Sequence, residues 1–406
     1  MPFEWVVAIR YLREQRLQTA LILSGIGVGV AVTIFLSALI NGLQQSLLAR
    51  TLGTQAHIVV HPQEDAVRPI LRSGVEMTVA TNVQKPPQRL RSILRWQQVE
   101  KEIRSLPEVT AVAPTVAGAA FAIRGMANKS VAVRGVDDDS YVRIVDMPSK
   151  IVGGTFRLHG TDAVIGTELA KDLGIDVGDK VRLETADGRT DVFSVTGIFD
   201  SGNKDLNQRW VFVSLRAAQT LLNLAGGVST IEVKLADPYQ AEIRANAIAD
   251  RTGLVADSWM KSNRDLLIAL RSQSSSSYMI QFFVAVAVAL GIASVLIVSV
   301  VQRSREIGIL RAIGTSRRRV IRVFLIQGAI LGAAGSLLGV GLGSALALFF
   351  ASLAKNPDGS ATFPVDLNLH LFVVSALLAI ATGLVAAVAP AHRAARLDPV
   401  EVIRSG

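Results

Sequence analysis

The chain has 406 residues, of which 50% are hydrophobic and only 18% are charged, and its net charge at pH 7 is +9. The charged share lies below the roughly 25% that is usual in soluble domains, and the mean hydropathy of +0.40 indicates a membrane protein. The sequence contains no Cys, which excludes disulfides, thiolate metal sites and a cysteine nucleophile.

Four stretches lack Asp, Glu, Lys and Arg over more than the roughly 20 residues that a helix needs to cross a bilayer. They predict membrane helices at 17–42, 277–302, 322–354 and 367–391. The first stretch could also be a signal peptide, but its apolar part is longer than the roughly 7–15 residues of a signal-peptide core. We therefore expect an α-helical membrane protein with four transmembrane helices and a large α+β extracytoplasmic domain between the first two.

The distribution of Arg and Lys predicts which side of the membrane each segment occupies. Residues 1–16, 303–321 and 392–406 hold most of the excess positive charge, so both termini and the 303–321 loop are expected in the cytoplasm. The positive charges of that loop and its border are Arg303, Arg305, Arg311, Arg317, Arg318, Arg319 and Arg322. Residues 43–276 and the loop 355–366 are then expected in the periplasm. The basic charge thus indicates topology, and no nucleic-acid partner is expected.

The uncharged stretches around the first and third spans are longer than a membrane requires. A helix of about 30 residues reaches roughly 45 Å, whereas the hydrocarbon core is roughly 30 Å thick. We expect the membrane helices to continue outward as stalks, at 43–48 after the first span and at 265–277 before the second.

Glycines recur at four-residue spacing in two spans, which lets another helix backbone approach closely. They serve either packing within one subunit or a dimer interface through the first and third spans, and the spacing does not separate the two. The residues are Gly25, Gly29, Gly328, Gly332, Gly335, Gly339 and Gly343.

Ionisable side chains are missing from the middle of every predicted span, and only His370 and His392 lie near span ends. Proton relays, ion pathways and intramembrane proteases normally need such groups. The sequence therefore disfavours a secondary transporter and an intramembrane enzyme.

The region between the first two spans alternates between strand and helix patterns. We expect a loop at 62–95 and a hairpin at 181–199 around Asp187-Gly188. The other expected strands are 57–61, 109–116 and 229–237, and the expected helices are 96–106, 168–174 and 215–224.

This outer region offers little chemistry. His57 and His61 lack a third ligand, so we expect a solvated strand end rather than a metal site. The three aspartates at 137–139 are expected to form a polar turn. No Gly-x-Ser-x-Gly motif occurs, so we expect the region to be a module that binds or grips a substrate. We expect the chain to be no enzyme and to hold no metal or cofactor.

A short helix is predicted between the second and third spans, where residues 305–314 read REIGILRAIG. Ile307 and Leu310 fall at helical spacing, Gly314 offers a C-terminal stop, and Thr315 with Ser316 can cap the next helix. The helix is either an interfacial helix with positive-inside arginines or a coupling helix that docks on a cytoplasmic motor.

Residues 304–343 resemble the signature of the MacB/FtsX-type ABC transporter permeases, and residues 390–404 resemble the usual ending of that family. The layout is similar too, with an amphipathic helix within 1–16, one span, a large outer domain and three further spans. In size the outer domain is most similar to that of the lipoprotein-releasing permeases LolC and LolE. The resemblance implies a porter-like domain at 43–136 and 226–276, with a β-rich insert at 137–225.

The resemblance also implies that the 303–321 loop carries a coupling helix that contacts an ATPase. The implied contact residues are Glu306, Ile307, Gly308, Ile309, Leu310, Arg311, Ala312, Ile313 and Gly314. No Gly-x-x-x-x-Gly-Lys-Ser/Thr loop occurs in the chain. ATP and Mg²⁺ are therefore expected in a separate cytoplasmic ATPase dimer.

By this resemblance we expect mechanotransmission in a bacterial inner membrane: closure of the ATPases moves the coupling helices, and the long helices carry that motion to the outer domains. The expected partners are the ATPase dimer, a second permease chain (identical or homologous), membrane lipid, and a periplasmic adaptor or lipoprotein carrier. Lipoprotein release toward the outer membrane is the expected task. Adaptor-linked export of small amphiphiles or peptides and FtsX-like activation of a cell-wall hydrolase are the alternatives.

Overall fold

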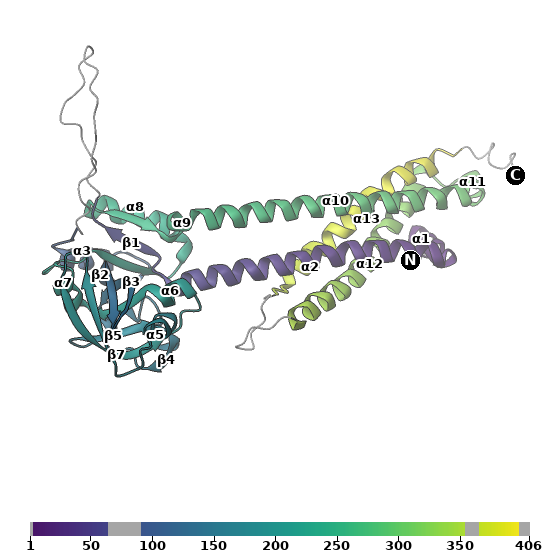
Figure 1. Cartoon of the computed structure of the whole chain (residues 1–406). Helices are drawn as coiled ribbons and strands as arrows, with labels where there is room; N and C mark the ends of the chain where they lie inside the picture. Colours follow the sequence, from purple (N-terminus) through teal and green to yellow (C-terminus); the bar gives the residue numbers. More distant parts are fainter. Residues whose placement is uncertain (1–2, 64–90, 354–364, 398–406) are drawn as a thin grey trace, which may run out of the picture. The chain divides into compact units, whose positions relative to one another are not determined.

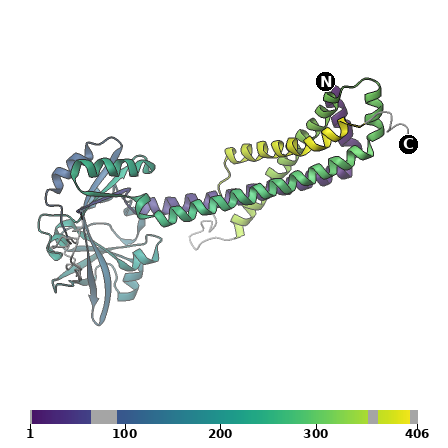
Figure 2. The ribbon, with the colours of Figure 1, turned by 90° about the horizontal axis from the view of Figure 1, so that it is seen from above.

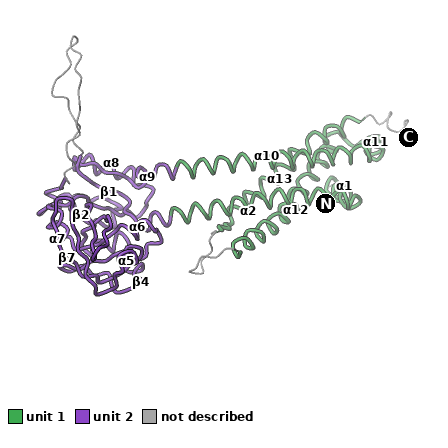
Figure 3. The backbone as a smooth tube through the Cα atoms, viewed as in Figure 1, with its two compact units in different colours: residues 1–48, 268–406 green, residues 49–267 purple. Residues whose placement is uncertain are grey.

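The computed structural model describes residues 3–63, 91–353 and 365–397. It divides into two compact units, one made of residues 1–48 with 268–406 and the other of residues 49–267 (Figure 3). We call them the helical unit and the α+β unit. The expected loops at 62–95 and 355–366 and the end of the tail at 392–406 lie largely outside the described residues.

Among its described residues the helical unit contains four helices that are long and apolar enough to cross a membrane, which confirms the expected number of membrane helices. The bounds of the spans stay a prediction. Two shorter helices, α1 and α11, accompany these four. The bounds are α1 Phe3–Glu14, α2 Arg16–Thr54, α10 Arg264–Gln302, α11 Ser304–Ala312, α12 Arg317–Leu353 and α13 Leu369–Ala395. α1, α11 and the last turns of α13 lie at the same end of this unit (Figures 1 and 2).

The core of the helical unit is aliphatic and draws on all four long helices. The antiparallel helices α2 and α10 run side by side (Figures 1 and 2), and Ile26 of α2 belongs to the same buried cluster as Ile292 of α10, Leu331 of α12 and Ala387 of α13. Hydrogen bonds also join α2 to α10: the Gln281 amide donates to the Ser37 hydroxyl at 2.9 Å.

Both helices that border the α+β unit are longer than a bilayer requires. α2 and α10 each have 39 residues, so each is about 58 Å long at 1.5 Å per residue, against roughly 30 Å of hydrocarbon. The expected stalk segments 43–48 and 265–277 are helical. α2 continues unbroken to Thr54, beyond the predicted end of its membrane segment at residue 42.

In its described residues the α+β unit is built on one sheet of ten strands in the order β10-β1-β9-β2-β3-β8-β5-β7-β4, with β6 paired to β2 and β7. The strands are β1 Ile58–His61, β2 Val109–Arg124, β3 Ala127–Val136, β4 Ile151–Gly154, β5 Asp162–Gly166, β6 Lys180–Thr185, β7 Thr190–Phe199, β8 Trp210–Ser214, β9 Thr230–Leu235 and β10 Val255–Ser258. The accompanying α-helices are α3 Trp96–Arg104, α4 Asp138–Tyr141, α5 Thr167–Leu173, α6 Lys204–Arg209, α7 Leu215–Leu221, α8 Ala241–Thr252 and α9 Trp259–Ser262.

Most predicted elements of this unit are present. The 181–199 hairpin is confirmed as β6 and β7, which pair from Lys180↔Ser194 to Glu184↔Thr190. The strand β3 was not predicted, and only the first half of β2 was predicted, as a strand at 109–116. β2 and β3 form a long hairpin closed by Gly125 and Met126, and Gly125 has φ +59°, the left-handed region that favours glycine.

The segment expected as an insert, 137–225, contributes strands β4 to β8 to this common sheet. It joins the rest through the parallel pair β3–β8, with Ala132 opposite Trp210, and through the antiparallel pair β2–β6. Its aromatic residues Phe199 and Phe212 share a buried cluster with Ala111 of β2 and Val136 of β3. The boundaries of the insert stay a prediction.

Two polar features of this unit differ from expectation or refine it. His57 is not at a solvated strand end: it is 4% exposed, and its Nδ1 accepts a hydrogen bond from the Leu235 N–H at 3.1 Å. His61 instead pairs with Asp257, at 3.0 Å.

Asp137 caps α4 by accepting a hydrogen bond from the Ser140 N–H. Among the described residues no three His, Asp or Glu side chains gather as a metal site would require.

Candidate coupling site

The short helix α11 ends in a Schellman motif, which confirms the predicted stop at Gly314. The Gly314 N–H donates to the Arg311 carbonyl and the Thr315 N–H donates to the Leu310 carbonyl, each at 3.1 Å. Gly314 has φ +104°, a backbone conformation that disfavours residues with a Cβ. The glycine thus turns the chain from α11 into α12.

One side of α11 is anchored in the helical unit. Ile307 is 2% exposed and packs with Val300 of α10, Phe324 of α12 and Ala391 of α13, and Gly308 is buried beside it. The Arg311 guanidinium donates to the Leu397 carbonyl, just beyond α13. This side therefore joins α11 to the ends of three long helices.

The other side of α11 is exposed among the described residues. Ile309 is 51% exposed and Ile313 is 80% exposed. The expected contact residues therefore divide into two groups. Ile307 and Gly308 are buried and Leu310 and Arg311 are half-buried, whereas Glu306, Ile309, Ala312, Ile313 and Gly314 are exposed. We call the exposed group the docking face. Exposed arginines follow it at Arg317, Arg318 and Arg319.

Arg303 lies at the corner between α10 and α11 and is only 6% exposed. Its Nη1 donates to Glu14 Oε2 at 2.8 Å and to Glu306 Oε2 at 3.3 Å. Its guanidinium carbon lies 4.2 Å from the centre of the Tyr11 ring. No role beyond its charge could be predicted for Arg303, because its partner Glu14 is 289 residues away and no local pattern relates the two.

The helix α1 packs on the same region. Ala8 and Tyr11 of α1 form a buried cluster with Val323 of α12. Hydrogen bonds from Arg10 and Arg303 lower the pKa of Glu14, so this carboxylate stays charged well below neutral pH. The Gln15 amide, between α1 and α2, donates to the Gln302 side chain at 3.0 Å.

The predicted glycines lie mostly at contacts within this one chain. Gly328 and Gly332 face α13, where added Cβ atoms would lie 2.4 Å from the Gly383 carbonyl oxygen and 2.7 Å from the Ala379 carbonyl oxygen. Gly335, Gly339 and Gly343 face α2 in the same way, and Gly29 faces Val288 of α10. Gly25 is exposed and has no neighbour within 4 Å of such a Cβ. Of the expected set, Gly25 alone has no helix against it in the part of the chain that the structure describes.

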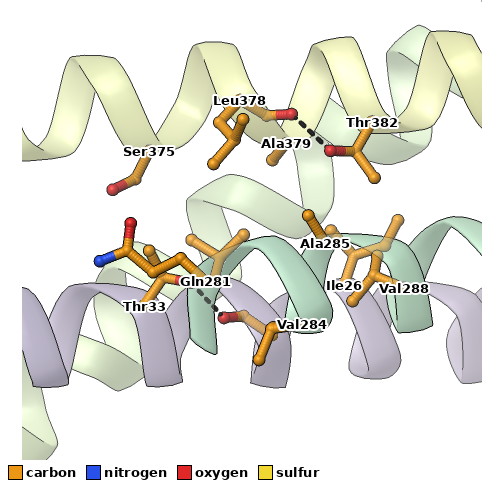
Figure 4. Close-up of a pocket in the computed structure, with 12 residues that line it drawn as sticks. Ile26, Thr33, Gln281, Val284, Ala285, Val288, Ser375, Leu378, Ala379 and Thr382 are labelled. Carbon is orange, nitrogen blue, oxygen red and sulfur yellow. Dashed lines mark hydrogen bonds between the residues drawn. The ribbon is translucent and has the colours of Figure 1, made fainter. Parts of the chain in front are cut away.

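A small cavity lies between α2, α10 and α13, with a volume of about 30 Å³ (Figure 4). Its walls are mainly aliphatic, but Thr33, Gln281, Ser375 and Thr382 bring polar groups to it. The Gln281 amide and the Ser375 side chain lie on opposite walls. The volume suits about one water molecule, which leaves no room for a substrate in this arrangement.

Comparison with known proteins identifies the family. Residues 19–250 match the MacB-like periplasmic core domain, and residues 278–399 match the FtsX-like permease C-terminal family. The chain is 26% identical to the lipoprotein-releasing system transmembrane protein LolC of Xylella fastidiosa, over 99% of each chain. It is 25% identical to LolE of Haemophilus influenzae, over 94% of this chain and 92% of LolE.

A second kind of relative is longer. The macrolide export ATP-binding/permease protein MacB of Vibrio parahaemolyticus is 25% identical over 98% of this chain, which spans 59% of MacB. These relatives and the four apolar helices indicate a protein of the inner membrane. The chain belongs to the family of ABC transporter permeases that join a MacB-like periplasmic core domain to an FtsX-like C-terminal membrane region.

Proposed function

We propose that this permease moves lipoproteins from the inner membrane toward the outer membrane, driven by a separate cytoplasmic ATPase that docks on α11. The proposal rests on the difference between the buried side and the exposed side of α11. Its Ile307 side is fixed to α10, α12 and α13, and its docking face presents Ile309 and Ile313. These two exposed isoleucines form an apolar surface that a partner protein can cover.

Charge near the docking face supports an ATPase as that partner. Arg317, Arg318 and Arg319 are exposed at the start of α12, and such a row steers the approach of a partner with an acidic rim. ATP and Mg²⁺ are assigned to the partner, because this chain has no phosphate-binding loop. The relatives whose names include both ATP binding and permease, such as MacB, are longer proteins, and this chain matches only part of their length.

The mechanism we propose is mechanotransmission. Nucleotide-driven closure of two ATPases moves α11, and α11 moves the ends of α10, α12 and α13 against which it packs. The unbroken 39-residue helices α2 and α10 are suited to carrying this motion to the α+β unit. In this proposal the α+β unit lies in the periplasm and both termini lie in the cytoplasm. The neutral cavity between α2, α10 and α13 holds no ionisable group among its lining residues, and such groups usually mark an ion path.

We prefer lipoprotein release to export because the similarity to LolC extends over 99% of each chain. Export of small amphiphiles or peptides with a periplasmic adaptor is the second candidate, which the match to MacB favours. A second permease chain, identical or homologous, completes the complex in either case, since ATPases of this kind act in pairs.

The test is reconstitution of the chain with its ATPase and second permease in proteoliposomes that contain a triacylated lipoprotein. ATP should release the lipoprotein to a soluble periplasmic carrier, and a catalytically dead ATPase should not support release. ATP hydrolysis that exports a small amphiphile but releases no lipoprotein would replace the first candidate by the second.

A further inference from the structure

Arg303 lies in the turn between α10 and α11, and the proposed docking face does not explain its burial. It is the residue between Gln302, the last of α10, and Ser304, the first of α11. Glu14, which binds it, is the last residue of α1 and lies two positions before Arg16, the first residue of α2. The ion pair therefore joins the corner that begins α2 to the corner that ends α10.

The arginine is held on several sides. A single nitrogen, Nη1, donates both to Glu14 at 2.8 Å and to Glu306 at 3.3 Å, and Glu306 lies in the first turn of α11. The guanidinium also stacks on Tyr11 of α1. Shared donors and a stacked guanidinium fix orientation as well as charge, which a lysine would not do. The Nε atom of Arg303 is buried without a hydrogen-bond partner among the described residues.

Neighbouring polar side chains tie the same two corners together. The Gln15 and Gln18 amides each donate to the Gln302 side chain, at 3.0 and 3.3 Å, and the Ser299 hydroxyl donates to Gln15 at 3.0 Å. Glu14 is also bound by Arg10 of its own helix at 2.7 Å, which holds the carboxylate in place for Arg303. The result is a polar layer between α1–α2 and α10–α11.

We propose that Arg303 is a positioning residue that clamps the starting turn of α2 to the α10–α11 corner, so that movement of α11 reaches both long helices together. The proposal rests on the proposed function, because it assumes that an ATPase moves α11. In this role α1 is a brace: it presents Glu14 and Tyr11 to the corner and rests on Val323 of α12. Without the clamp, movement of α11 would reach α2 only through its packing and hydrogen bonds with α10, so the two long helices would move together less completely.

The test compares Arg303→Gln and Glu14→Gln with the control Arg13→Gln in the reconstituted complex. Arg13 is an exposed residue of the same helix, so its variant removes one charge near Glu14 without touching Arg303. We expect the two clamp variants to bind the ATPase and hydrolyse ATP like wild type, while lipoprotein release per ATP falls about tenfold, the size of a typical coupling effect. The control should keep wild-type release.

A covalent substitute separates the clamp from a merely structural role. The chain contains no Cys, so Glu14→Cys with Arg303→Cys provides the only two thiols for a short bifunctional cross-linker. Cross-linking this variant should restore release per ATP. Unchanged release in Arg303→Gln, or no recovery in the cross-linked variant that still binds the ATPase, would overturn the proposal.

A readout that needs no substrate keeps the two proposals apart. A fluorophore on Gln44→Cys reports on α2, far along that helix from its first residue, Arg16, and its signal should change when the bound ATPase traps nucleotide. Wild type that binds the ATPase but releases no lipoprotein would contradict the proposed function alone. The clamp would still stand if Arg303→Gln abolished the nucleotide-dependent signal, and would fall if the signal persisted.

Discussion

Ile307 and Ile309 lie two residues apart on α11, yet 2% of Ile307 and 51% of Ile309 is exposed. Ile307→Ala should lower the free energy of unfolding by about 2–5 kcal/mol, because it leaves a cavity among helices α10, α12 and α13. Ile309→Ala should leave stability within about 0.5 kcal/mol of wild type. Unfolding of the two purified variants in the same detergent measures the difference, and equal losses would contradict this burial of α11.

The glycines of α12 give a second stability contrast. Gly332→Ala should destabilise the helical unit by about 1–3 kcal/mol, because its Cβ would lie 2.7 Å from a backbone carbonyl oxygen of α13. Gly25→Ala meets nothing within 4 Å and is the matched control within a membrane helix. Thermal unfolding in detergent measures both. A larger loss at Gly25 than at Gly332 would show that another chain packs on α2 there.

The buried ion pair between Arg134 of β3 and Glu232 of β9 predicts a non-additive pair of mutations. Burial opposes the charge on Arg134, but the Glu232 carboxylate and the Tyr141 hydroxyl outweigh it and raise the pKa of the guanidinium. Arg134→Met should cost about 3–5 kcal/mol, since it leaves Glu232 buried and unpaired. Adding Glu232→Leu should recover much of that loss in urea unfolding. A double variant as unstable as the sum of the singles would contradict this pairing.

The neutral state of His57 predicts sensitivity to acid. Burial and the nearby Lys234 ammonium lower the pKa of His57 in the folded chain, whereas an unfolded histidine titrates near pH 6.5. The unfolded state takes up its proton first as pH falls. The α+β unit should therefore lose stability from about pH 6.5 downward, until the folded-state pKa is passed.

Tryptophan fluorescence reports on this region, because Trp259 lies close to His57 in space: the backbone N–H of Trp259 donates to the His57 carbonyl at 2.9 Å. Urea unfolding at pH 7.5 and 5.5 should show a smaller pH dependence in His57→Gln than in wild type. The exposed His159 is the control, and His159→Gln should keep the wild-type dependence. Equal pH dependence in all three proteins would show that His57 is not the titrating group.

Features set by local chemistry could be predicted from the sequence. Uncharged stretches identified the four membrane helices, Gly314 identified the end of α11, and Asp187-Gly188 identified the β6–β7 turn. The β2–β3 turn was missed, because Gly125-Met126 lacks the Asn-Gly or Asp-Gly pair that marks a two-residue hairpin.

Features set by distant contacts could not be predicted. Whether His57 is buried depends on β9, and the division of α11 depends on α10, α12 and α13 meeting around Ile307. The burial of Arg303 depends on Glu14 at the other end of the chain. In each case the periodicity of the local segment is the same whether its side chains are buried or exposed.

The central claim is that the docking face of α11 recruits a separate ATPase. The direct measurement is purification of the chain from its native membrane in mild detergent, with quantitative mass spectrometry of the proteins that accompany it, for wild type and for Ile309→Asp with Ile313→Asp. The account predicts an ATPase, a second permease and lipoproteins with wild type, and loss of the ATPase alone from the folded double variant. An ATPase that accompanies both proteins equally, or neither, would contradict it.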